Sequence, residues 1–302
     1  MANYIILGRD GRPSIRGVFS LMKSDCIIMV RRRFKGKEYW RRYTNHNSTR
    51  YEKINTFSPS AGDKVIRWGT RIEFPQTGFT SVNSPRALGR ATNKLLARQV
   101  FAEHNVPAPR LITPSNFDEV NPTLVVARPH QHSKGKNFVT LKTKAEFVEH
   151  YNIYNAGWYY SQFIDKTSEY RVHCAFGKVI AVLKKPKPED TEVIAWNRSI
   201  NHEAFTHVAI EEVKKSVLLV ALQATSALGL DISAVDVIWR NPNAYVLEVN
   251  TAPTLNSSPL TTEKYAKVFD WVFNFGNKTW DYTTFEKGSS LLWKNFQLEN
   301  NI

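Results

Sequence analysis

Short apolar runs between polar turns predict that the first 82 residues form a region of strands. Glycine- and proline-containing clusters at 8–13 and 58–63 predict breaks in the chain, and the polar stretch 44–58 predicts a mobile loop. The apolar runs of strand length are Tyr4 to Leu7, Cys26 to Val30 and Val65 to Trp68.

Two helix starts follow. Asn83-Ser84-Pro85 and Thr92-Asn93 place capping residues before helical periodicity, the first with proline where a missing N–H does no harm. The second helix is expected to end at His104-Asn105, before a proline-containing segment, with Lys94 at its start. Its predicted core face comprises Leu96, Ala97, Val100 and Phe101.

From Thr123 the pattern is again that of strands. Apolar runs at 123–129 and 136–141 flank the polar, glycine-bearing link 130–135. Such a link suits either an ordinary hairpin turn or a loop whose backbone N–H groups wrap a polyphosphate. Three further runs follow closely and predict one antiparallel sheet: 158–165, 169–176 and 178–185.

Charged residues alternate with apolar ones in the second of these three runs. Glu169, Arg171 and His173 are therefore expected to share one face of a strand, with Lys184 facing them from the next strand. The alternative is a solvent-exposed row of ordinary charge pairs.

Residues 210–228 have helical periodicity and end before Gly229, so we expect a long helix packed beneath the hairpin that follows. Its predicted buried stripe comprises Ile210, Val213, Val217, Val220, Ala221, Ala224 and Leu228.

That hairpin carries two carboxylates and an amide inside apolar runs. Asp236 lies in 234–239, Glu248 and Asn250 lie in 245–250, and the link 241–243 predicts the turn. Antiparallel pairing can bring the three side chains together. An all-oxygen ligand set favours Mg²⁺, which usually shares its shell with waters and nucleotide phosphates. The alternative is ordinary pairing with basic side chains.

The 302-residue chain is 42% hydrophobic, as in a globular protein of two or three lobes. No apolar run approaches the roughly 20 residues that span a bilayer, so no membrane segment is expected. Cys26 and Cys174 are far apart and the eight histidines form no ligand pattern. We therefore expect no zinc, two core thiols and a cytoplasmic location.

The net charge of +14 is concentrated near the N-terminus, where residues 1–53 hold 13 Lys and Arg against 4 Asp and Glu. Residues 31–43 interleave basic and aromatic side chains, which suits the phosphates and bases of a nucleic acid or another polyanion. A solvated basic hairpin, or a surface that attracts an acidic small substrate, are the alternatives.

Taken together, the order of these motifs resembles the ATP-grasp superfamily over roughly residues 65–265. The resemblance rests on Asn93-Lys94 before the helix, the VVAR strand, the polar glycine loop, QFID followed by EYRVH, and VDVI with LEVN. Residues 66–70 and 82–85, with Asn93-Lys94, are similar to a subgroup common in bacteriophage genomes, which implies a host cytoplasm if the chain is phage-encoded.

The resemblance implies an α+β, three-lobed fold in which ATP lies between a small central antiparallel lobe and a C-terminal α+β lobe. The implied parts are a basic N-terminal lobe over 1–82, a helical linker over 83–122, the small lobe over 123–188 and the C-terminal lobe over 189–302.

It also implies roles for individual residues. Lys94 and Arg128 would contact the ATP phosphates, Glu169 the ribose, and Thr251 to Ser258 would line the acceptor pocket. The implied phosphate loop includes Ser133, Lys134 and Gly135, and the implied adenine hinge is Gln162, Phe163, Ile164 and Asp165. The implied magnesium ligands are Asp236, Glu248 and Asn250, and the implied catalytic residues are Arg171, Lys184, Asn197 and Arg198.

Three positions depart from the family pattern. Arg128 replaces a common lysine but keeps the charge and can bind phosphate with two N–H groups. Asn137 stands where a second glycine is usual, and asparagine tolerates left-handed backbone. Ala234 occupies a position where some ligases of the superfamily have arginine, which bears on donor contacts more than on ATP binding.

The reaction implied is ATP-dependent joining of a carboxylate and an amine into an amide through an acyl phosphate, with Mg²⁺, or Mn²⁺ in its place, as the metal. Two rivals stay open. An ATP-grasp kinase would phosphorylate a hydroxyl of a polyanionic substrate, and a nucleic-acid-binding protein would use only the basic N-terminal lobe.

Overall fold

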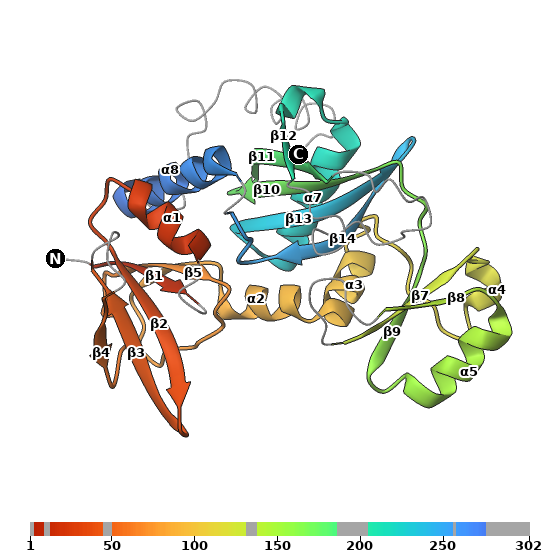
Figure 1. Cartoon of the computed structure of the whole chain (residues 1–302), viewed down its shortest axis with the longest axis horizontal. Coiled ribbons are helices and arrows are strands. Elements are labelled where there is room, and N and C mark those ends of the chain that lie inside the picture. Colours follow the sequence, from red (N-terminus) through yellow and green to blue (C-terminus); the bar gives the residue numbers. More distant parts are fainter. Residues whose placement is uncertain are drawn as a thin grey trace.

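The computed structural model describes residues 3–8, 13–44, 50–130, 138–185, 205–255 and 258–275. Three sheets with their helices lie side by side, with the N-terminal sheet at one end and the smallest sheet at the other (Figure 1). No helix in these ranges combines the length and apolar character needed to cross a membrane.

The N-terminal sheet has the order β4-β3-β2-β1-β5-β6. Its central strand β1 runs parallel to both β2 and β5. A parallel connection needs a crossover, and helix α1 (Pro13–Leu21), which the turn-rich sequence before it did not predict, supplies it between β1 and β2. The strands are β1 Tyr4–Gly8, β2 Ile27–Phe34, β3 Lys37–Tyr43, β4 Glu52–Ile54, β5 Lys64–Trp68 and β6 Thr80–Val82.

Both predicted helix starts are confirmed. The side chains of Ser84 and Asn93 cap α2 (Pro85–Thr92) and α3 (Lys94–Glu103) by accepting backbone N–H bonds. The predicted core face of α3 is wrong at Leu96, which is 37% exposed, whereas Arg98 is buried.

The smallest sheet has the order β8-β7-β9 and is entirely antiparallel. The fully buried ring of Phe147 centres its core and stacks on Phe117 with ring centroids 5.2 Å apart. Its elements are α4 Phe117–Val120, β7 Val125–Pro129, β8 Val139–Leu141, α5 Lys144–Tyr154 and β9 Trp158–Gln162.

The third sheet has the order β12-β11-β10-β13-β14 and is also antiparallel. Helix α7 (Lys215–Leu228) packs on the face that carries Val172, Val235 and Val237, and α8 (Pro259–Phe275) lies between β11 and the N-terminal sheet. The strands are β10 Ser168–Ala175, β11 Lys178–Lys185, β12 Thr206–Val208, β13 Ile232–Arg240 and β14 Asn243–Asn250.

The prediction of one sheet for three successive strands is wrong. β9 pairs with β7 in the smallest sheet, whereas β10 pairs with both β11 and β13 in the five-stranded sheet. Residues 123–188, predicted as one small lobe, therefore contribute to two sheets. The predicted long helix also begins later, at Lys215, after the 3-10 turn Ile210–Glu212, although its buried stripe and the left-handed Gly229 after it are confirmed.

Candidate active site

Asp236 and Glu248 lie directly opposite one another on β13 and β14. Immediately beyond this pair the register shifts, because Val237 pairs with Val246 and Leu247 is an extra residue in β14. This β-bulge reverses the alternation of side chains. Val246 and Val249 both pack in the core with α7, while Glu248 faces the opposite side with Asp236.

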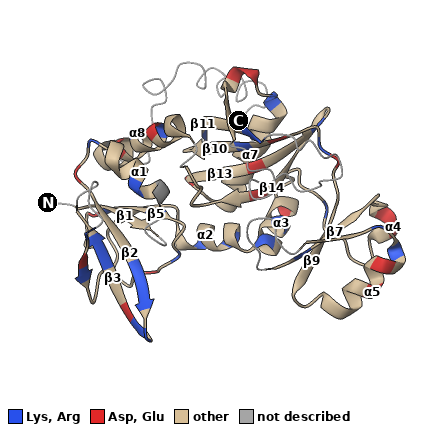
Figure 2. Cartoon of the chain, viewed as in Figure 1, with Lys and Arg blue, Asp and Glu red and all other residues tan. Residues whose placement is uncertain are grey.

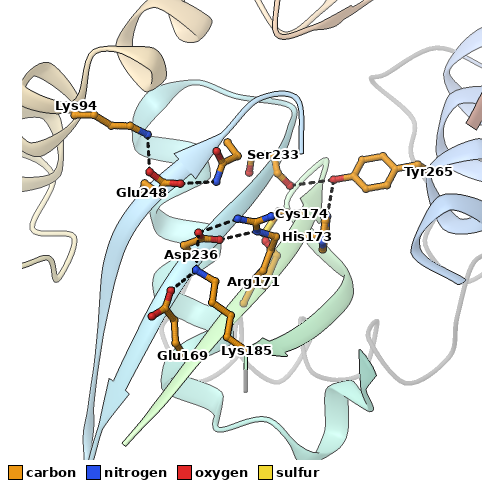
Figure 3. A network of polar contacts seen from close by, with 12 residues as sticks. Lys94, Glu169, Arg171, His173, Cys174, Lys185, Ser233, Asp236, Glu248 and Tyr265 are labelled. Carbon is orange, nitrogen blue, oxygen red and sulfur yellow. Dashed lines mark hydrogen bonds and ion pairs between the residues drawn. The ribbon is translucent and has the colours of Figure 1, made fainter. Parts of the chain in front are cut away.

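Arg171 of β10 lies opposite Asp236 and binds it with two hydrogen bonds. Nε donates to Oδ1 at 2.7 Å and Nη2 donates to Oδ2 at 3.0 Å (Figure 3). Burial raises the pKa of Asp236, but the charges of Arg171 and Lys185 outweigh burial and lower it. The buried carboxylate is therefore ionised, and the pair is a fixed element of the site.

Lys185 at the end of β11 links two carboxylates. Its Nζ lies 3.1 Å from Asp236 Oδ2 and also donates to Glu169. Burial lowers the pKa of Lys185, but Asp236 and Glu169 outweigh burial and raise it. The site thus has a continuous row of alternating charges, in which Glu169 also pairs with Lys166.

Lys94 at the start of α3 reaches the second carboxylate of the hairpin. Its Nζ lies 3.0 Å from Glu248 Oε2, and Asn250 Nδ2 donates to Glu248 Oε1 at 3.1 Å. The charge of Lys94 lowers the pKa of Glu248 well below its usual range. Lys94 is therefore an ion-pair partner within the site.

The predicted position of Lys184 is wrong. Lys184 is exposed and pairs in register with Tyr170, whereas Lys185 pairs with Glu169 and is 8% exposed. Since alternate residues of paired strands share a face, only Lys185 can join Glu169 and Arg171. The sequence contains both lysines, and only the register of β10 against β11 distinguishes them.

Comparison with known proteins identifies the family. The model of the RimK-like ATP-grasp domain matches residues 91–272, more than half of the chain. The chain belongs to this family. It is an ATP-grasp protein, as the resemblance implied. The similarity to a bacteriophage subgroup stays a prediction.

Two relatives are each named a probable alpha-L-glutamate ligase. The one from Maridesulfovibrio salexigens is 26% identical over 242 residues, which cover 73% of this chain and 78% of the relative. The one from Parasynechococcus marenigrum is 26% identical over 227 residues, or 70% of this chain. That match spans 47%, or about half, of the relative's length.

Two solved structures share the ATP-grasp fold. The ligase PsnB, complexed with a phosphomimetic variant of a minimal precursor, Mg and ADP, has a TM-score of 0.61 at 13% identity and covers 89% of this chain and 99% of its own. D-alanyl-alanine synthetase A from Vibrio cholerae has a TM-score of 0.60 at 12% identity, covering 91% of this chain and 98% of its own.

The implied adenine hinge of this ATP-grasp protein, Gln162 to Asp165, connects the smallest sheet to the five-stranded sheet. Backbone bonds hold its start, where Gln162 N donates to Arg110 O and Phe163 N donates to Leu124 O, each at 2.9 Å. Arg128 of β7 lies over the Phe138 ring at 5.8 Å. The roles of these residues remain predictions.

Several implied site residues lie outside the described ranges. They are the phosphate-loop residues Ser133, Lys134 and Gly135, the neighbouring Asn137, the catalytic candidates Asn197 and Arg198, and residues 256–257 of the acceptor segment. Their roles likewise remain predictions.

The described residues of this ATP-grasp protein hold no group of three or more His, Cys, Asp and Glu side chains arranged for a metal. Asp236, Glu248 and Asn250 offer two carboxylates and one amide, which is an all-oxygen set that fits Mg²⁺ completed by waters and phosphates. Because Asn250 donates its Nδ2 to Glu248, its amide oxygen remains as an acceptor for a cation.

His173, which the alternating pattern placed beside Arg171, is fully buried and pairs with Tyr265 of α8. Its Nδ1 lies 3.0 Å from the Tyr265 hydroxyl (Figure 3). Burial and the nearby charge of Arg171 lower the pKa of His173 to about 3. The predicted alternative of a solvent-exposed face is therefore excluded for this strand.

Proposed function

We propose that this protein is an ATP-dependent ligase that joins a carboxylate and an amine into an amide, giving ADP and phosphate. The observation that carries the proposal is the pair of carboxylates and their paired cations on one face of the five-stranded sheet. Asp236 and Glu248 lie opposite each other, with Arg171 and Lys185 against the first and Lys94 against the second. The names of the relatives, probable alpha-L-glutamate ligases, support it.

The reaction needs charge neutralisation and positioning more than a protein nucleophile. The substrate carboxylate attacks the γ-phosphate of ATP, forming an acyl phosphate and ADP, and the amine then displaces phosphate. Arg171 and Lys185 are two fixed cations that can stabilise charge on the transferred phosphoryl oxygens. Lys94 and Arg128 would bind the other phosphates.

Mg²⁺, held by Asp236, Glu248 and Asn250, would supply neutralisation of the phosphate charges. A neighbouring ligase structure with Mg and ADP supports this choice of metal, and Mn²⁺ is a substitute to be tested. Lys94, Arg171 and Lys185 balance the charges of the two carboxylates when no metal is bound. The same three cations would contact phosphate oxygens when ATP and Mg²⁺ are bound.

The amine acceptor is proposed to be an amino acid or a peptide. This proposal follows the names of the neighbours, which include a D-alanyl-alanine synthetase and a ligase complexed with a precursor. Thr251 to Ser258, after the last metal ligand, are the proposed acceptor segment. The cytoplasm is the proposed compartment, in keeping with two free, buried cysteines.

Nucleic acid or another polyanion is a second proposed partner, at residues 31–43. These residues lie in the β2–β3 hairpin, where several Lys and Arg positions fall close together along the ribbon (Figure 2). Several rings of the hairpin are already covered by cations of the same lobe, since Arg16 lies over Tyr43 at 5.0 Å and Lys53 over Tyr39 at 4.9 Å. Phosphate contacts are therefore favoured over base stacking.

The experiment is incubation with ATP, Mg²⁺ and pooled amino acids, peptides and polyamines, following ADP, free phosphate and new masses. We expect equal amounts of ADP and phosphate and a product heavier by one amide-linked unit. ADP without free phosphate would instead support the kinase. Glu248→Gln should abolish turnover while Glu211→Gln, at an exposed glutamate, should not. Full activity of Glu248→Gln would contradict the proposal.

A further inference from the structure

Arg98 is a buried cation in the middle of α3, only 8% exposed. Its guanidinium binds the backbone of the metal-site strand. Nη1 donates to the carbonyl of Val246 at 2.8 Å, and Nη2 donates to the carbonyl of Leu247 at 2.7 Å. Burial lowers the pKa of Arg98 to about 10, so the side chain is charged near neutral pH.

These two carbonyl groups belong to the β-bulge of β14. In a regular strand, consecutive carbonyl groups point to opposite sides, so one guanidinium cannot bind both. Here the extra residue Leu247 turns its carbonyl to the same side as that of Val246. Arg98 thus satisfies two neighbouring backbone carbonyl groups at the bulge.

The bulge decides where Glu248 points. Without Leu247 as an extra residue, strict alternation would put Glu248 on the same face as Val246, towards the apolar core with α7. With the bulge, Glu248 lies opposite Asp236 on the other face. The orientation of a proposed magnesium ligand therefore depends on a backbone irregularity held from another element.

One face of α3 contacts both the backbone and the side chain of this segment. Lys94 and Arg98 are four residues apart, so they are neighbours on the helix surface. Lys94 pairs with the Glu248 carboxylate, while Arg98 binds the two preceding carbonyl groups. The chain after the helix adds a third link, since Val246 N donates to Pro107 O at 2.9 Å.

We propose that Arg98 is a positioning residue for Glu248: it fixes the β14 bulge and thereby holds the carboxylate in the orientation that binds magnesium. The inference rests on the proposed function, because it assigns a supporting residue to the same site. A purely structural Arg98 would affect folding stability and nucleotide binding in general. A positioning Arg98 affects the part of nucleotide affinity that depends on Mg²⁺.

The test is calorimetric titration of ADP, with and without Mg²⁺, into the full chain and its variants at a temperature where each is folded. Arg98→Lys keeps the positive charge but lacks the planar guanidinium that binds the Val246 and Leu247 carbonyl groups together. Arg86→Lys, at an exposed position of α2, is the matched control. Hydrogen exchange of the β14 amides is measured on the metal-free proteins.

We expect Arg98→Lys to weaken ADP binding about tenfold in Mg²⁺ and to leave binding without Mg²⁺ unchanged, as for loss of a charged hydrogen bond. Exchange at 247–249 should accelerate, and Arg98→Lys should have no further effect in a Glu248→Gln background. If Arg98→Lys does not fold, Arg98→Gln, which can donate to one carbonyl, gives the same readout.

The inference is overturned if Arg98→Lys behaves like Arg86→Lys, if it weakens ADP binding equally with and without Mg²⁺, or if its effect adds fully to that of Glu248→Gln. Glu248→Gln by itself distinguishes failure of the proposed metal site from failure of the proposed role of Arg98. If Glu248→Gln retains Mg²⁺-dependent ADP binding, the proposed metal site itself is wrong and the role of Arg98 falls with it.

Discussion

Lys185 of β11 contacts Asp236 of β13 across the intervening strand β10, with Nζ 3.1 Å from Oδ2. The long lysine side chain spans the width of a strand to reach the carboxylate that Arg171 already binds. Two cations therefore meet one carboxylate in a buried environment.

Lys185→Met should lower the rate of ADP formation by at least about a hundredfold, because it removes a cation aimed at the transferred charge. It should also lower the free energy of unfolding by about 3 kcal/mol, since Glu169 and Asp236 lose a buried partner. Lys184→Met, at the exposed neighbour, is the control and should change neither quantity substantially. Equal losses in both variants would show that the buried pairing does not matter.

Arg171→Met should destabilise the fold by about 3–5 kcal/mol in urea unfolding, because Asp236 is left buried without its two-bond partner. The double variant Arg171→Met, Asp236→Leu should recover a large part of this loss, since no uncompensated charge remains. Both variants should lack activity. A double variant that is less stable than Arg171→Met would contradict this explanation.

The buried His173 should make the free energy of unfolding depend on pH. Its folded pKa is about 3, below the roughly 6.5 of an unfolded histidine, so the unfolded state binds the extra proton between these values. Stability should fall as pH drops from 6.5 towards 3, by up to about 1.4 kcal/mol per pH unit from this residue.

His173→Gln should remove that contribution, so the urea-unfolding free energy of the variant should change less between pH 6.5 and 5 than that of the wild type. His104→Gln, at an exposed histidine after α3, is the control and should follow the wild type. An unchanged slope in His173→Gln would mean that this residue is not the neutral buried group inferred from the structure.

Gly69, directly after β5, lies close to Ala252 in the segment after the proposed metal ligands. A Cβ atom there would lie 2.7 Å from the Ala252 Cβ, and its φ of +71° disfavours any side chain. Gly69→Ala should therefore cost more than the about 1–3 kcal/mol of left-handed backbone alone, and it should reduce activity by shifting the residues after Asn250.

Gly36→Ala separates the two causes, because Gly36 has a φ of +77° and nothing within 4 Å of the added Cβ. Gly36→Ala should therefore lower the free energy of unfolding only by the cost of the left-handed backbone. Adding Ala252→Gly to Gly69→Ala should recover the excess. Equal unfolding free energies for Gly36→Ala and Gly69→Ala would show that the close approach to Ala252 does not destabilise the Gly69 variant.

Local sequence patterns predicted much of the chain because they act over a few residues. The caps at Ser84 and Asn93, the helix end before Gly229 and the turn between β13 and β14 all depend on neighbouring backbone groups, and the structure has them close to where they were expected. Helix α1 was not predicted. A crossover is needed there because β1 and β2 pair in parallel, and this pairing cannot be recognised from the residues of the helix itself.

The sequence by itself determined which chemical groups are available to the site: an acid at Asp236, an acid and an amide at Glu248 and Asn250, and basic residues in a recognisable order. Tertiary structure alone decided how they combine. The β10–β11 register selects Lys185 over Lys184, and the bulge at Leu247, bound by Arg98, turns Glu248 away from the core. Register and bulges arise from pairing between distant segments, so no local pattern encodes them.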